Sequence, residues 1–181
     1  MAFITLTPEN VMSEHLCCAI ADKKHQTGVN DKRNWLAERI KEGHVFRNLD
    51  AHGKVFFEYA PLEKAWVPVT GDNYFYIYCL WVSGSYKGKG YGKELLQSCI
   101  DDAKAQGKSG ICLLSSKKKK PFLSEKKFML KYGFKVVDTI NDEYELLALS
   151  FDGTQPKFTS NVRKQSIEGK ELTIYYGVQC P

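Results

Sequence analysis

The sequence predicts a single α/β (α+β) domain of roughly 150 residues whose sheet contains a parallel strand pair. Tyr74–Val82 is a run of aromatic, aliphatic and β-branched residues, the composition of a buried strand. A glycine-rich segment then leads into a helix whose apolar stripe is Leu95, Leu96, Cys99, Ile100 and Ala103. The next apolar run, Ile111–Ser115, is typical of a strand buried on both faces beside a parallel neighbour.

The residues before this core predict a strand followed by two helices. The strand is Phe3–Leu6, and Thr7 with Pro8 is typical of a helix start. The apolar face of that first helix comprises Met12, Leu16, Ala19 and Ile20. A break at Thr27–Asn30 precedes the second helix, which Asn30 or Asp31 caps and which ends near Gly43.

Two hairpins and a loop complete the predicted elements. Val45–Leu49 and Lys54–Ala60 flank the turn residues of the first hairpin. Pro61–Asp72 is a loop, in which Trp66 is expected to pack over the rim of a cleft rather than contact a ligand. The glycine-loop helix ends near Gln106 with Gly107 as its cap, and Pro121 is expected to open a short helix through Leu130. The second hairpin joins 136–139 to 144–149.

Composition excludes several classes of protein. No run approaches the roughly 20 apolar residues of a membrane span, and the N-terminus lacks the pattern of a signal peptide. We therefore expect a cytoplasmic protein. The histidines share no ligand spacing and no cysteine stands in a C-x-x-C pair, so we predict no metal site and no disulfide. The cysteines are Cys17, Cys18, Cys79, Cys99, Cys112 and Cys180.

The glycine loop between the central strand and its helix predicts a phosphate site. Free backbone N–H groups at the positive end of a helix attract anions, and lysines alternate with Gly88, Gly90 and Gly92. The dinucleotide fingerprint fails because Lys93 stands at its last glycine position. The nucleotide-triphosphate loop fails at Gly107, because Asp102 replaces its first glycine and a strand follows. What remains is a basic-x-x-Gly-x-Gly pattern directly after the strand.

This pattern resembles the pyrophosphate loop of the GNAT family, the acetyl-CoA-dependent N-acetyltransferases. The order of the predicted elements is also that of the GNAT fold, and Gly133-Phe134 stands where family members carry a Gly-Phe before a late strand. The resemblance covers about residues 3–150. It implies a mixed, mostly antiparallel sheet with flanking helices, in which the strands 74–82 and 111–115 splay apart. More narrowly, the chain resembles bacterial GNAT proteins that carry a C-terminal YoaP-like domain.

The resemblance implies which residues hold acetyl-CoA. In the family, the pantetheine arm pairs with unpaired backbone groups where the parallel strands splay. Carried over, this contact falls on Leu80, Trp81 and Val82. The pyrophosphate falls on the glycine loop and the first helical turn, which comprise Lys87, Gly88, Lys89, Gly90, Tyr91, Gly92 and Lys93.

Two family residues for proton transfer are missing. The glutamate base that some members carry corresponds to Tyr76, a poor base near neutral pH. The tyrosine that protonates the thiolate corresponds to Met129, and Tyr132 is expected to face elsewhere on the helix. Candidates by strand position alone are Glu58, Tyr76, Tyr78 and Ser115, each with a structural role as its alternative. Proton removal through ordered water needs none of them.

The resemblance implies an N-acyltransferase that moves an acetyl group from acetyl-CoA to an amine by direct attack in a ternary complex. The alternative is a catalytically silent CoA-binding sensor or assembly module, and nucleic-acid binding is a distant third. The four lysines at 117–120 are expected to form a solvated, positively charged loop. Its role is solubility, attraction of the CoA 3′-phosphate or attraction of an acidic acceptor. The acceptor amine is not specified, and a homodimer is compatible with the sequence.

The tail predicts a second unit. After the domain at 3–150, residues 151–169 are expected to be a linker. Leu172–Tyr176 is a further strand that leads to Cys180-Pro181, an order with which thioredoxin-like units begin. We therefore expect 170–181 to be the start of a truncated second domain, the alternative being a strand added to the edge of the first sheet.

Overall fold

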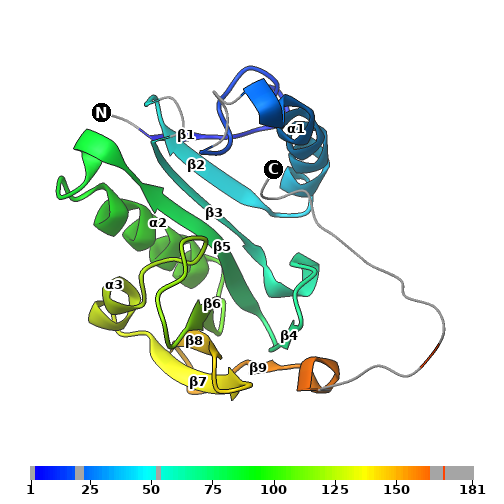
Figure 1. The fold of residues 1–181 in the computed structure, drawn as a ribbon, viewed down its shortest axis with the longest axis vertical. Coiled ribbons are helices and arrows are strands. Elements are labelled where there is room, and N and C mark those ends of the chain that lie inside the picture. Colours follow the sequence, from blue (N-terminus) through cyan, green and yellow to red (C-terminus); the bar gives the residue numbers. More distant parts are fainter. Residues whose placement is uncertain (1–2, 19–22, 52–53, 164–168, 170–181) are drawn as a thin grey trace.

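The computed structural model describes residues 3–18, 23–51, 54–163 and 169, and Figure 1 shows their fold. A seven-stranded sheet in the order β1-β2-β3-β5-β6-β8-β7 forms its centre. Its strands are β1 (Phe3–Thr5), β2 (Val45–Leu49), β3 (Val55–Pro61), β5 (Tyr74–Val82), β6 (Gly110–Ser116), β7 (Lys135–Ile140) and β8 (Tyr144–Ser150). Only β5 and β6 run parallel among these neighbours. The predicted α/β fold with a mixed, mostly antiparallel sheet is confirmed.

The other elements flank this sheet. The α-helices are α1 (Gln26–Ile40), α2 (Tyr91–Ala105) and α3 (Lys126–Lys131), and a small second sheet pairs β4 (Val69–Thr70) with β9 (Lys157–Phe158). The 3₁₀ turns are η1 (Lys23–His25), η2 (Leu62–Lys64), η3 (Gly84–Tyr86) and η4 (Ser160–Arg163). No helix in the described part of the chain is long and apolar enough to cross a bilayer.

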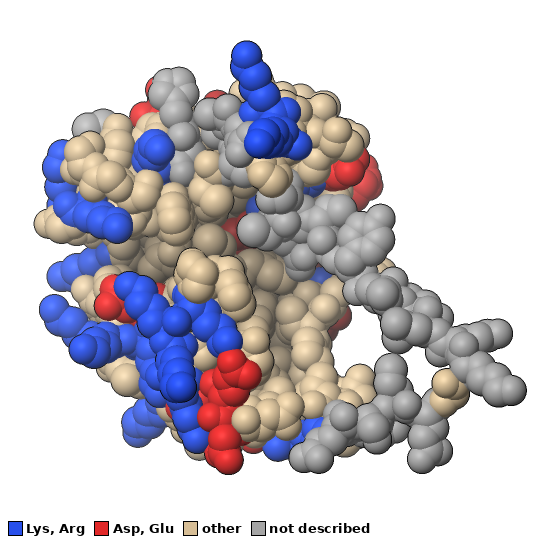
Figure 2. Space-filling model, in the orientation of Figure 1, with Lys and Arg blue, Asp and Glu red and all other residues tan. Residues whose placement is uncertain are grey.

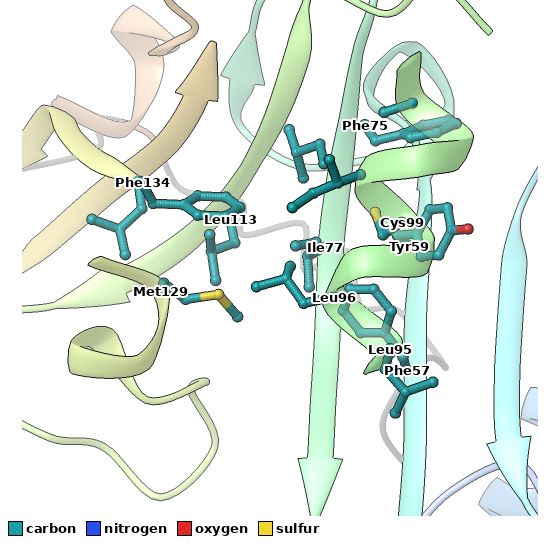
Figure 3. Close-up of a cluster of buried hydrophobic side chains, with 14 of the residues drawn as sticks. Phe57, Tyr59, Phe75, Ile77, Leu95, Leu96, Cys99, Leu113, Met129 and Phe134 are labelled. Atoms are coloured by element: carbon teal, nitrogen blue, oxygen red, sulfur yellow. The ribbon is translucent and has the colours of Figure 1, made fainter. Parts of the chain in front are cut away.

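Helices cover both faces of the sheet. The apolar stripe of α2 packs on β3, β5 and β6, and Met129 of α3 joins the same cluster (Figure 3). Val29 and Leu36 of α1 pack on the opposite face against Phe46 and Phe56. We call these the α2 face and the α1 face. In Figure 1, α2 lies behind the sheet and α1 lies beside β2.

Two expectations about the N-terminal third were wrong. Residues 8–14 form successive turns instead of a regular helix, with Val11 N–H bonded to the Thr7 carbonyl at 3.0 Å and Thr7 N–H bonded to Asn10 Oδ1 at 2.8 Å. Val11 and Leu16 are nevertheless fully buried on the α1 face. The next helix, α1, begins at Gln26 and so includes the residues at which a break was expected.

The hairpins β2–β3 and β7–β8 form as predicted, and Gly107 follows α2 with a positive φ of 63°. Two local expectations, about the start of the short helix and about Trp66, were wrong. The short helix α3 begins at Lys126, five residues after Pro121. Trp66 is 89% exposed and does not pack over a cleft rim.

Residues 151–163, which the sequence assigned to a linker, pack against the domain. β9 pairs antiparallel with β4, and Phe158 is buried in a cluster with β5, β6 and β8 side chains. Arg163 Nη2 lies 2.6 Å from Asp138 Oδ2 of β7. The expected start of a second domain at 170–181 lies outside the described residues.

Candidate functional site

A β-bulge sets the direction of the side chains at the end of the central strand. Glu58 of β3 stands opposite Cys79, but Tyr59 stands opposite Ile77, so Tyr78 is an extra residue in β5. An extra residue resets the alternation of side chains between the two faces. Beyond the bulge, Leu80 and Val82 therefore pack toward the α2 face, whereas Cys79 and Trp81 pack on the α1 face.

The parallel strands separate next to this bulge. Their pairing ends at Ile77 and Leu113, although β5 continues to Val82 and β6 to Ser116. One edge of β5 therefore has no β6 partner from Tyr78 onward. The splay that the family resemblance implied is present, and it leaves backbone groups that an extended ligand can pair with.

A cavity of about 610 Å³, here called the glycine-loop cavity, opens where β5 ends. It is bounded by the end of β5, the glycine loop, the start of α2 and one side of α3. Its lining includes eight of the predicted acetyl-CoA residues: Leu80, Val82, Lys87, Gly88, Gly90, Tyr91, Gly92 and Lys93. Sequence reasoning missed the other six, which are Tyr86, Ser124, Glu125, Phe128, Lys131 and Tyr132.

Two predicted residues lie outside this lining. Trp81 packs with the α1-face cluster because the bulge directs it there. Lys89 extends over the ring of Tyr86, with Nζ 5.7 Å from the ring centre. Their side chains are thus not part of the cavity surface, although their backbones belong to β5 and to the loop.

The backbone of the glycine loop is shaped to receive an anion. Gly88 and Gly90 have φ of 76° and 89°, and a Cβ built on either would meet no atom within 4 Å. The first helical bond of α2 joins the N–H of Glu94 to the carbonyl of Gly90, so the preceding N–H groups have no acceptor within the helix. These donors combine with the dipole of a 15-residue helix and with Lys87 and Lys93 to favour bound phosphate.

Glu58 is committed to a buried ion pair. Its Oε2 lies 2.7 Å from Lys32 Nζ, and its Oε1 lies 2.9 Å from His44 Nε2, with all three side chains almost fully buried. Burial would raise the pKa of Glu58, but Lys32 and the His44 hydrogen bond outweigh it and hold the pKa below its usual value. A carboxylate so stabilised is a poor proton acceptor, so the structural reading of Glu58 is favoured.

The other three candidates also lie outside the glycine-loop cavity. Tyr76 is buried, and the burial raises the pKa of its hydroxyl well above the usual range. The Tyr78 hydroxyl donates a hydrogen bond of 2.6 Å to the carbonyl of Ala65. Ser115 is buried at the end of β6 and lines a second cavity. These contacts favour structural roles for the two tyrosines.

One expectation about α3, that Tyr132 would face away from the site, was wrong. Met129, which takes the family tyrosine position, is fully buried and points into the core on the α2 face (Figure 3). Tyr132 instead lines the glycine-loop cavity, with its ring centre 4.8 Å from that of Phe128. The six-residue α3 ends before Tyr132, so helical spacing cannot be extrapolated to that side chain.

One known protein is similar to this chain in sequence, and several solved structures are similar to it in fold. A Bacillus subtilis (strain 168) protein described as "Uncharacterized N-acetyltransferase YoaP" is 45% identical over 183 positions, which span the whole of this chain and 73% of that protein. The fold resembles the PaiA N-acetyltransferase of Thermoplasma acidophilum in complex with coenzyme A, with a TM-score of 0.57 and 16% identity over 83% of this chain and 100% of that one.

A GNAT family acetyltransferase from Brucella melitensis in complex with acetyl-CoA is also similar in fold. Its TM-score is 0.51 and its identity is 12%, over 87% of this chain and 93% of that chain. Residues 10–134 match the Acetyltransferase (GNAT) family, and this match includes the bulge, the splayed strands and the glycine loop. The chain therefore belongs to the GNAT family of acetyltransferases.

Proposed function

We propose that this protein transfers the acetyl group of acetyl-CoA to an amine by direct attack in a ternary complex. The observation that carries the proposal is one cavity in which the N-terminus of α2, three lysines and the open edge of β5 meet. Lys87, Lys93 and the loop N–H groups fit a pyrophosphate, and the edge beyond Tyr78 fits the two amides of a pantetheine arm. Family membership and the relative named as an N-acetyltransferase support the same activity.

The chain contributes position and polar groups to this chemistry. Acetyl-CoA supplies the activated thioester, and the splay would hold it beside the amine. The oxyanion that forms when a neutral amine attacks would be stabilised by backbone N–H groups of β5 near Leu80, on the edge that β6 does not pair. Tyr132 is the group that we propose donates a proton to the departing thiolate, because its hydroxyl-bearing ring lines the cavity. The amine proton leaves through water, since Glu58 and Tyr76 are poor bases.

The experiment that tests the function is release of free thiol from acetyl-CoA over a panel of amines, peptides and aminoglycosides. Calorimetry with acetyl-CoA alone accompanies it. An acetyltransferase binds acetyl-CoA and releases thiol only when its acceptor is present. Binding without thiol release on any acceptor would favour the silent sensor, and absence of binding would overturn both readings. A cytoplasmic location and a homodimer stay predictions, and the panel is designed to identify the acceptor amine.

A further inference from the structure

A second cavity of about 380 Å³ opens beside the glycine-loop cavity and is here called the lysine cavity. It shares Ser124 and Glu125 with its neighbour, and its floor includes Ser115 and Ser116 at the end of β6. The glycine loop follows the parallel strand β5, whereas the lysine cavity follows its parallel partner β6. Both therefore lie at the carboxyl ends of the splayed pair, where ligands of such sheets bind.

Five lysines and one glutamate supply the charge of the lysine cavity. The lysines are Lys117, Lys119, Lys120, Lys126 and Lys127. Figure 2 shows Lys and Arg side chains gathered, with acidic groups beside them, over the region where Figure 1 places α3 and the loop before it. Most of these lysine side chains are exposed, so packing in the core does not account for them.

Three of these lysines are already neutralised and hold the loop in place. Lys117 Nζ lies 3.0 Å from Asp142 Oδ1 in the β7–β8 turn, and Lys120 and Lys126 pair with Glu143 and Glu145. The Lys117 N–H also bonds to the Glu143 carbonyl at 2.9 Å. Cation–anion pairs thus fix one wall of the cavity against β8 and its turn.

Lys119 and Lys127 differ from the other three lysines of the cavity in their surroundings. Both are exposed and line the cavity, and within the described residues neither forms an ion pair. Two such ammonium groups outnumber Glu125, the one carboxylate of the lining, and together match a carboxylate or a phosphate monoester. The Ser115 side chain adds a polar atom to the floor, whereas the Ser116 hydroxyl already donates a hydrogen bond of 2.6 Å to the Lys118 carbonyl. The site is therefore suited to one anionic group of a small molecule.

We propose that the lysine cavity binds an anionic group of the acceptor, so that the substrate is an amine that also carries a carboxylate or phosphate. The proposal rests on the acetyltransferase function above. The glycine loop already provides a place for the pyrophosphate of acetyl-CoA, and the lysine cavity opens on the β6 side of the splay. An acceptor amine that reaches the splay from that side would place its anionic group between Lys119 and Lys127.

The first test compares amines that carry an anionic group with related amines that lack it, and thiol release from acetyl-CoA is the readout. The pairs are phosphoethanolamine with ethanolamine, and γ-aminobutyrate with its amide, γ-aminobutyramide. The anionic member should be used with a kcat/KM about tenfold higher or more, the effect of one charge-assisted hydrogen bond. The double variant Lys119→Gln/Lys127→Gln should lose this preference, whereas Lys64→Gln/Lys135→Gln, which removes the same charge elsewhere, should keep it. No preference in the parent chain would overturn the proposal.

A second test needs no acceptor turnover. Inorganic phosphate is titrated into the CoA-saturated protein while the backbone amide NMR shifts of residues 115–127, except Pro121, are followed. Shift changes that saturate, and that the double variant lacks, support the site. If phosphate binds only when dephospho-CoA replaces CoA, the cavity serves the cofactor's 3′-phosphate and the acceptor proposal falls. If calorimetry shows that the parent chain does not bind acetyl-CoA, the proposed function itself is rejected.

Discussion

At the scale of single residues, the end of α3 decides which side chain reaches the cavity. Met129 is inside the helix and points to the core, whereas Tyr132 follows the last helical residue. Gly133 has a φ of 90°, which turns the chain so that Phe134 enters the core while Tyr132 stays at the cavity. The turn at Gly133 therefore keeps the Tyr132 side chain at the cavity, although the position of Tyr132 in the sequence does not indicate this.

Tyr132→Phe tests the role of that hydroxyl. We expect kcat to fall about a hundredfold, because a positioned proton donor contributes at least this much, while the acetyl-CoA Kd stays nearly constant. Tyr86→Phe is the matched control, since Tyr86 lines the same cavity at the glycine loop. Steady-state kinetics and calorimetry separate the two effects. Unchanged turnover in Tyr132→Phe would assign the proton to water or to another group.

At the scale of elements, a buried ion pair attaches α1 to the central sheet. Lys32 stands at a core position of α1, between Val29 and Leu36, and reaches Glu58 of β3. His44, just before β2, completes the contact and stacks on Tyr78 with ring centres 5.2 Å apart. This cluster lies where β5 is bulged, so it connects α1 to the strand segment that forms the open edge.

Glu58→Gln should lower the free energy of unfolding by about 3 kcal/mol near neutral pH, because it removes the carboxylate that forms an ion pair with the buried Lys32. The folded pKa of Glu58 lies below its ordinary value of 4.5, so the unfolded chain binds the proton more readily. The difference between parent and variant should therefore shrink as pH falls below 4.5 and through the folded pKa. Urea denaturation at several pH values measures it.

Glu42→Gln is the control for that series, since its pair with Arg39 is partly exposed and should contribute less than about 1 kcal/mol. An equal loss of stability in both variants, or a difference that does not depend on pH, would contradict the assigned role of Glu58.

At the scale of the whole molecule, the sequence predicts the central sheet better than the segments that pack against it. Central strands and α2 carry clear apolar patterns, so their order and the glycine loop could be predicted. The apolar face expected for the first helix included Met12 and Leu16, but the turns that form there bury Leu16 together with Val11 and leave Met12 57% exposed. The bulge at Tyr78 and the pairing of Lys32 with Glu58 depend on contacts between distant residues, which local patterns do not contain.

The segment after β8 is also part of the domain. Phe158 is 4% exposed, and its N–H bonds to Asp138 Oδ2 at 2.9 Å. We expect Phe158→Ala to lower the free energy of unfolding by about 3–5 kcal/mol, the usual cost of removing a buried ring. The control Phe122→Ala removes a ring that is 67% exposed and should change stability by less than about 0.5 kcal/mol. Thermal denaturation that gives equal stability for both variants would contradict this packing.

The most direct measurement for the whole account is the acetyl-CoA affinity of Gly90→Asp, determined by calorimetry. The variant places a carboxylate where the loop N–H groups are proposed to bind pyrophosphate, so the affinity should fall at least about a hundredfold. Gly107→Asp is matched, because Gly107 also has a positive φ and open space and flanks the other end of α2. Its affinity should equal that of the parent. Parental affinity in a folded Gly90→Asp variant would contradict the assignment of the glycine loop as the acetyl-CoA site.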